Sequence, residues 1–140
     1  MSQRTNVYVD GFNLYYGCLR HSYFKWLDLG LLFQKLLPTN DLVHIRYFTA
    51  PIVPRPRDPQ QGVRQQTYLR ALRTLPHLSV IEGRFLVTYP RMMKADLSGA
   101  VAVIKTEEKG SDVNIASHIL TDAFDDQYDV AVLVSNDSDL

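Results

Sequence analysis

Residues 130–140 read VAVLVSNDSDL, and this stretch decides the fold. Five consecutive apolar residues (130–134) run directly into Ser135, Asn136, Asp137, Ser138 and Asp139. An unbroken apolar run that ends at turn residues is typical of a strand in a parallel sheet covered on both faces. Parallel sheets bind their ligands beyond the carboxyl ends of the strands, so two carboxylates there indicate chemistry rather than an ordinary turn.

Strand and helix patterns alternate along the rest of the chain. The segment NVYVD (6–10) predicts a first strand that ends in Asp10. We expect further strands over 42–52, 78–88 and 100–108, and helices after residue 10, within 26–38, after residue 62 and over 111–124. This alternation predicts an α/β fold in which helices cover both faces of a mainly parallel sheet.

Length and composition indicate one globular domain. A chain of 140 residues is long enough for a substantial core. It begins without an apolar signal core and contains no apolar run of membrane-spanning length, so we expect a cytoplasmic protein without a membrane partner. The single cysteine, Cys18, cannot form an internal disulfide and is interpreted as a packing residue of the first helix.

The charges are segregated along the chain. Residues 1–105 hold 14 Lys and Arg and 6 acidic residues, whereas residues 106–140 hold Lys109 and 9 acidic residues. This distribution predicts an acidic pocket on a basic body. Because clustered carboxylates repel phosphate, such a pocket needs a divalent cation before it can act on a phosphorylated substrate.

The helix predicted over 111–124 brings in another acid. Its apolar stripe comprises Ile115, Ala116, Ile119, Leu120 and Ala123. Asp112 lies three and four residues before the first two, which places it on the same buried stripe, behind a serine N-cap at Ser111. The alternative is that Asp112 only stabilises the helix N-terminus through the helix dipole.

Four carboxylates therefore converge on one sheet edge: Asp10, Asp112, Asp137 and Asp139. Like charges at such distances raise one another's pKa values and destabilise the fold unless a cation is present. Oxygen donors without a matching Cys or His set favour Mg²⁺ or Mn²⁺, which suits phosphodiester hydrolysis. The chain has no G-x-G-x-x-G after its first strand, no P-loop and no second Asp two residues after Asp10, which argues against dinucleotide folds, P-loop enzymes and haloacid-dehalogenase-like phosphatases.

Three segments together carry a family resemblance. YVDGFNLYYG, EKGSDVNIASHIL and YDVAVLVSNDSDL resemble, in this order, the motifs of the NYN domain, a branch of the PIN-like nuclease superfamily. The likeness runs from about residue 6 to the last residue. It implies a flavodoxin-like, three-layer α/β/α sandwich and a metal-dependent ribonuclease. Family members continue beyond the last motif, so we expect residues 1–140 to be a single domain that lacks its C-terminal portion.

The resemblance also implies roles for individual residues. Asp10, Asp112, Asp137 and Asp139 match the metal-site acids, and Asn13 matches the polar residue of the D-G-x-N block. Asn136 stands where many relatives have glycine.

Further residues are candidates for substrate binding. Arg55 and Arg57 lie in the proline-rich segment 51–62, a stiff loop that loses little entropy on meeting RNA phosphates. Ser135 and Asn136 are also candidates for contacting the substrate. The alternatives are ordinary solvated charges for the arginines and a turn-stabilising hydrogen bond for Ser135.

Two functions from different classes stay open. The first is a Mg²⁺- or Mn²⁺-dependent ribonuclease, endonucleolytic rather than exonucleolytic. The second is a catalytically weak, PIN-like RNA-binding or regulatory module. The presence of all four acids favours the nuclease, and the oligomeric state, a homo-oligomer included, stays undecided.

Overall fold

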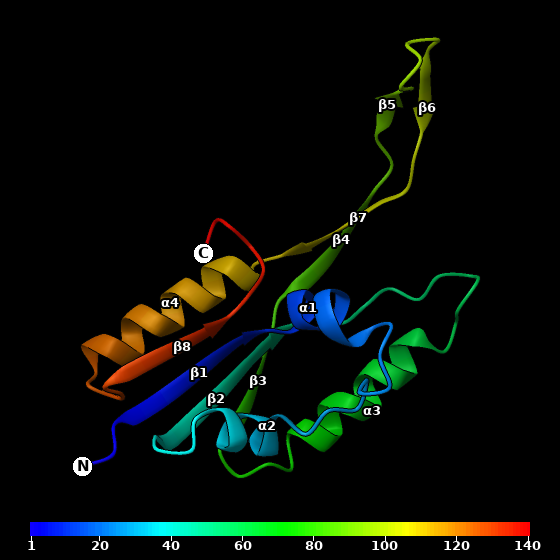
Figure 1. The fold of residues 1–140 in the computed structure, drawn as a ribbon. Coiled ribbons are helices and arrows are strands. Elements are labelled where there is room, and N and C mark those ends of the chain that lie inside the picture. The colour runs from blue at the N-terminus through cyan, green and yellow to red at the C-terminus, as the bar shows by residue number, and fades with distance from the viewer.

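A four-stranded parallel sheet forms the centre of the computed structural model, which describes residues 1–140 (Figure 1). Its strand order is β3-β2-β1-β8, with bounds β1 Arg4–Asp10, β2 Asp41–Thr49, β3 Leu78–Glu82 and β8 Val130–Val134. Because β1 pairs with β8 in parallel, Val9 lies opposite Val134. The first strand and the last strand thus end side by side, and the predicted mainly parallel α/β sheet is confirmed.

Helices cover both faces of this sheet. Helices α2 (Leu29–Leu36) and α3 (Gln61–Leu72) lie on one face, and α4 (Ser111–Phe124) lies on the other (Figure 1). The short helix α1 (Gly11–Leu14) and the π-helix η1 (Tyr15–Leu19) follow β1 at the carboxyl edge of the sheet. None of the helices combines the length and the apolar character that a membrane span requires.

Residue alternation in β1 divides the core into two layers. Val7 and Val9 are fully buried and pack in the cluster that contains Phe33 of α2 and Leu69 of α3. Tyr8 points to the opposite face and packs with Ile115 of α4. The two-residue period of a strand therefore supplies both hydrophobic layers from one segment and fixes β1 in the middle of the sandwich.

Two of the predicted strands are wrong in their extent and place. The segment 78–88 breaks at Gly83 into β3 and β4 (Arg84–Thr88), and the segment 100–108 breaks into β6 (Ala100–Ala102) and β7 (Lys105–Lys109). β4 pairs antiparallel with β7, and β5 (Arg91–Met93) pairs with β6. These four strands form an arm that projects from the body (Figure 1). A Cβ at Gly83 would lie 2.7 Å from the carbonyl oxygen of Lys109, so the close crossing at the base of the arm requires glycine.

The buried stripe of α4 also differs from the prediction. Ala116, Leu120 and Ala123 are exposed, and Asp122 is buried instead. The cause is a buried polar contact, because Arg46 binds the Asp122 carboxylate at 2.7 and 2.8 Å and so turns that side of the helix inward.

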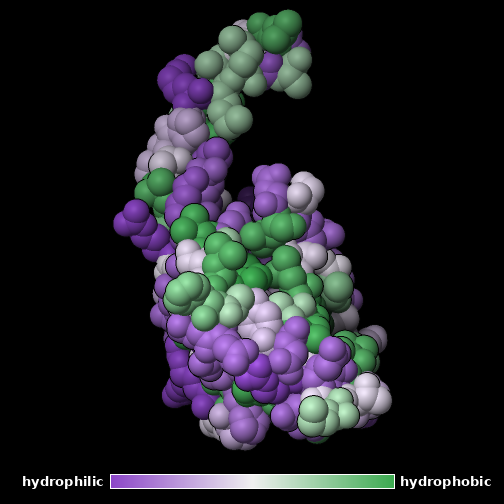
Figure 2. Space-filling model, turned by 90° about the vertical axis from the view of Figure 1, so that its left-hand side faces the viewer, coloured by the Kyte–Doolittle hydropathy of each residue, from purple (hydrophilic) through white to green (hydrophobic).

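Two further expectations about burial are wrong. Cys18 is exposed, because the face of η1 that carries it points away from the core. β8 forms an edge of the sheet, so Ala131 and Leu133 are exposed rather than covered on both sides. Figure 2 shows apolar groups interspersed with polar ones on one side of the body, with the arm projecting above it.

Candidate functional site at the carboxyl edge

Asp10 is the buried anchor of the site, with only 2% of its surface exposed. It ends β1 and caps α1, because its Oδ1 accepts a hydrogen bond from the backbone N–H of Asn13 at 3.2 Å. Its Oδ2 accepts a second bond from Asn13 Nδ2 at 2.6 Å. Asn13 therefore orients the Asp10 carboxylate, which keeps lone pairs for a further partner.

Gly11 sets the position of Asp10. A Cβ at this residue would lie 2.6 Å from Cζ of Tyr47 and 2.7 Å from the carbonyl oxygen of Phe48. Only glycine permits this approach of α1 to β2. The order Asp-Gly in the first motif is therefore a packing requirement as well as a sequence signature.

Asp112 occupies the first turn of α4, but it is exposed rather than part of the buried stripe. Gly110, with φ of 96°, precedes the helix as its N-cap, so the expected serine cap at Ser111 is wrong. Partial burial raises the pKa of the Asp112 carboxyl, and the charges of Asp137, Asp10 and Asp139 raise it further. Asp112 thus lies within reach of the charges of the other three predicted acids.

The terminal motif forms a compact turn after β8. The backbone N–H of Asp137 donates to Ser135 Oγ at 3.0 Å, and the N–H of Asp139 donates to Asp137 Oδ1 at 3.0 Å. Ser135 therefore makes the turn-stabilising contact that was the alternative to substrate binding. Asn136 and Asp139 are exposed, and Asp137 is half-buried.

Glu108 is a further acidic residue at the carboxyl edge of the sheet, and the sequence motifs did not predict it. It lies on β7 at the base of the arm and accepts a hydrogen bond from Ser111 Oγ. Burial raises its pKa to about 7, and the charges of Asp10 and Asp112 add to the shift. An acid at the end of a strand-like segment, four residues before Asp112, is the same kind of signal that identified Asp10.

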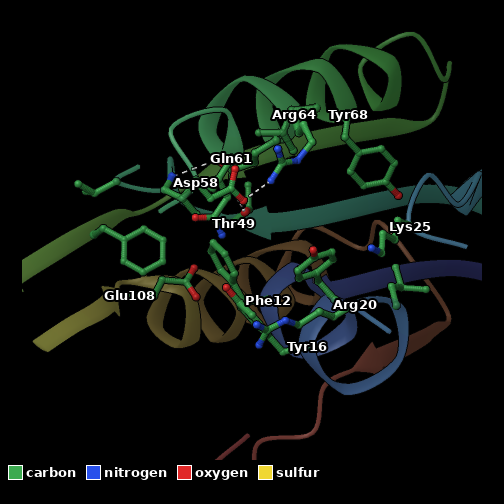
Figure 3. Close-up of a pocket in the computed structure, with 18 of the residues that line it drawn as sticks. Phe12, Tyr16, Arg20, Lys25, Thr49, Asp58, Gln61, Arg64, Tyr68 and Glu108 are labelled. Atoms are coloured by element: carbon green, nitrogen blue, oxygen red, sulfur yellow. Dashed lines mark hydrogen bonds and ion pairs between the residues drawn. The ribbon is translucent and has the colours of Figure 1, made fainter. Parts of the chain in front are cut away.

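A cleft opens next to these acids, with a volume of about 1020 Å³. It lies between α3 on one side and α1 with η1 on the other, and Glu108 is part of its lining (Figure 3). Aromatic residues contribute much of its wall, namely Phe12, Tyr15, Tyr16, Trp26, Tyr47, Tyr68 and Phe85. The sequence alone does not assign the tyrosines to a site, because tyrosines in these positions also fit a helix face or a core.

Arg55 and Arg57 extend from the proline-rich loop into the lining of this cleft. Both are exposed, and neither guanidinium has a carboxylate within 4.0 Å. The loop therefore places two unpaired positive charges in the cleft that Glu108 also lines, and their contact with RNA phosphates stays a prediction.

Comparison with known proteins identifies the family. The profile of the NYN domain matches residues 4–140. The chain belongs to the NYN domain family. The resemblance read from the three motifs is confirmed, and with it a nuclease-like α/β fold.

A curated relative of this NYN domain carries the name of a different activity. The chain is 35% identical over 165 aligned residues to the 6-hydroxy-3-succinoylpyridine 3-monooxygenase HspA of Pseudomonas putida (strain DSM 28022 / S16). The alignment covers 98% of this chain and 53% of the relative, so the chain spans about half the length of that protein. No solved structure matches.

The donor set of this NYN domain fits a hard divalent cation in its chemistry. The carboxylates supply only oxygen ligands. Burial is the main cause of the raised pKa values of Glu108 and Asp112, and the charges of neighbouring carboxylates add to both. However, no three acidic, histidine or cysteine side chains are arranged around one point.

Proposed function

We propose that this NYN domain hydrolyses RNA phosphodiester bonds with Mg²⁺ or Mn²⁺ held at the carboxyl edge of its sheet. The observation that supports the proposal is the charge at this edge: Asp137, Asp10 and Asp139 each raise the pKa of the Asp112 carboxyl, and unpaired cations line the adjoining cleft. The cations attract the phosphate backbone, and the acids supply the ligands for the ion. The family match supports nuclease chemistry in general terms.

Each residue has a role in this proposal. Asp10, Asp112 and Asp137 would hold the ion, and Asp139 would add charge or orient a water. Asn13 keeps the Asp10 carboxylate in place through its two hydrogen bonds. When bound, the ion polarises the phosphoryl oxygen and lowers the pKa of a water nucleophile. The exposed Arg55 and Arg57 position the RNA backbone in the cleft.

Cleavage of a labelled RNA tests this proposal. The wild-type chain is compared with Asp10→Asn and Asp137→Asn, in Mn²⁺ and in EDTA. Loss of one ligand should lower the cleavage rate on the order of 10²-fold or more, because a bound ion supplies several kcal/mol of transition-state stabilisation. RNA binding should change little, because the phosphate contacts come from the basic residues.

Asp125→Asn is the matched control, since Asp125 lies at the opposite end of α4 from Asp112 and forms no ion pair. Equal rates in all four proteins, or cleavage that survives EDTA, would refute the metal-nuclease proposal. If RNA binding persisted without cleavage, the chain would be an RNA-binding or regulatory module instead.

The relative HspA suggests a second candidate, oxygenation of a small aromatic acid. The observation that favours it is the cleft itself, whose volume and aromatic wall suit a small-molecule ligand. Monooxygenation transfers one atom of O₂ to the substrate and reduces the other atom to water with two electrons and two protons. The assay therefore contains air as the source of O₂ and a reduced nicotinamide as the electron donor. Consumption of 6-hydroxy-3-succinoylpyridine by a chain that leaves RNA intact would favour this candidate over the nuclease.

A further inference from the structure

The aromatic wall of the cleft keeps flat surfaces open to solvent. Tyr16 is 49% exposed and Trp26 is 58% exposed, although both lie in a lined cavity rather than on a convex surface. Phe12 supports Tyr16 from behind in a stacked contact with 6.1 Å between ring centroids. Tyr68 supports Trp26 edge-on at 6.1 Å. Each ring is therefore held in place by a second ring while about half of its residue surface stays exposed to the cleft and solvent.

The same cavity carries an excess of positive charge. Arg20, Lys25, Arg55 and Arg57 line it, and none has a carboxylate within 4.0 Å. Arg64 is different, because Asp58 binds it (Figure 3). The Arg20 guanidinium lies 5.5 Å from the centroid of the Tyr16 ring, which links the cationic side of the cleft to its aromatic side.

We propose that this cleft binds a planar aromatic ring that carries an anionic group. The ring stacks on Tyr16 and Trp26, and the anion is held by guanidinium groups of Arg20, Arg55 and Arg57. A nucleotide of RNA and a small aromatic carboxylate share this chemistry. The inference deepens the proposed function, because it assigns the substrate class at the same edge, but it concerns binding and needs no metal.

The combination of exposed aromatic rings and unpaired cations distinguishes this cleft from a general phosphate-binding surface. A surface that reads only the RNA backbone needs cations without rings. A pocket for a purely apolar ligand would leave the four cations that line this cleft without counterions. Stacking residues together with cations in one groove is the combination that proteins use for unpaired bases.

The chain contains one tryptophan, and it lies in the cleft, so its fluorescence reports on binding directly. In EDTA, adenosine 5′-monophosphate, a short single-stranded RNA and 6-hydroxy-3-succinoylpyridine are each titrated onto the intact chain, with equilibrium dialysis as a second readout. Adenosine supplies the ring without the anion, and ribose 5-phosphate supplies the anion without the ring. We expect the complete ligand to bind at least tenfold more tightly than either half.

Variants locate the two halves of the site. Tyr16→Leu keeps an apolar side chain but removes the flat ring, and Arg57→Ala removes one cation. Each should weaken binding of the preferred ligand about tenfold. Arg70→Ala is the control, because Arg70 is exposed on the same basic part of the chain and does not line the cleft.

The comparison of ligands decides the source of the aromatic anion. Tighter binding of the nucleotides would assign an RNA base, and tighter binding of the pyridine acid would assign a small metabolite. Equal binding of adenosine and its monophosphate, or no binding of any ligand, would overturn the inference. Because these titrations contain EDTA, a failed cleavage assay with intact binding would refute the nuclease and leave the cleft assignment standing.

Discussion

The substitution Glu108→Gln should change how the stability of the chain depends on pH. The pKa of Glu108 is raised from 4.5 to about 7, so the folded state binds this proton more tightly than the unfolded state does. The free energy of unfolding should therefore fall as pH rises from about 4.5 through about 7. The shift corresponds to at most about 3.4 kcal/mol. Because solvent reaches part of the side chain, we expect a fall of about 1 to 2 kcal/mol.

Urea unfolding in EDTA at several pH values between 4 and 8 measures this effect. Glutamine keeps the acceptor for Ser111 but cannot ionise, so the variant should lose the decline and be more stable than the wild type at pH 8. Glu107→Gln is the matched control, because its neighbours Lys105 and Lys109 hold the pKa of that carboxyl below its usual value. Parallel pH profiles for the wild type and Glu108→Gln would refute the reasoning.

Three further predictions follow from individual contacts. Gly11→Ala should lower the free energy of unfolding in urea by about 1 to 3 kcal/mol, because the added Cβ would lie 2.7 Å from the carbonyl oxygen of Phe48. Gly17→Ala is the control, because a Cβ at Gly17 would have no neighbour within 4 Å. Asp122→Asn should cost about 2 to 3 kcal/mol at pH 7, since Arg46 loses its charged partner. Burial would raise the pKa of the Asp122 carboxyl, but hydrogen bonds from Arg46 and Tyr8 hold it below its usual value. The stability difference between the wild type and Asp122→Asn should therefore shrink as acid protonates the wild-type carboxylate. An equal loss of unfolding free energy at pH 7 and pH 3 would contradict this prediction. Added Mn²⁺ should raise the melting temperature, and Asp10→Asn with Asp112→Asn should remove that response; an unchanged response would place the ion elsewhere.

The central sheet could be predicted because its strands carry strong local signals. NVYVD ends in Asp10, and the apolar run VAVLV is followed within three residues by Asp137. The parallel pairing of these two strands follows from the helices between them. The arm could not be predicted in the same way, because β-branched residues mark a strand without saying which sheet it joins. Its separation depends on a contact distant in sequence, the close approach of Gly83 to Lys109.

Only part of the candidate site could be predicted from the sequence, for a related reason. Asp10 could be placed from its position at the end of β1, whereas Glu108 required knowledge of the arm. Alternation along β7 sends Thr106 and Glu108 into the cleft and leaves Glu107 between Lys105 and Lys109. Which of two adjacent glutamates faces the site is decided by strand register, and the sequence does not give that register.

The ion pairs of the structure show which of the acidic residues concentrated after residue 105 are neutralised and which are not. Four of the nine acids after residue 105 are neutralised by a cation, namely Glu107, Asp122, Asp126 and Asp129. Asp125 stays unpaired at the far end of α4. The remaining four, Glu108, Asp112, Asp137 and Asp139, lie at the carboxyl edge with Asp10 and have no cationic partner from the chain. The fold thus neutralises its acids elsewhere and leaves uncompensated negative charge where an external cation could bind, which is the physical reason to search for metal at this edge first.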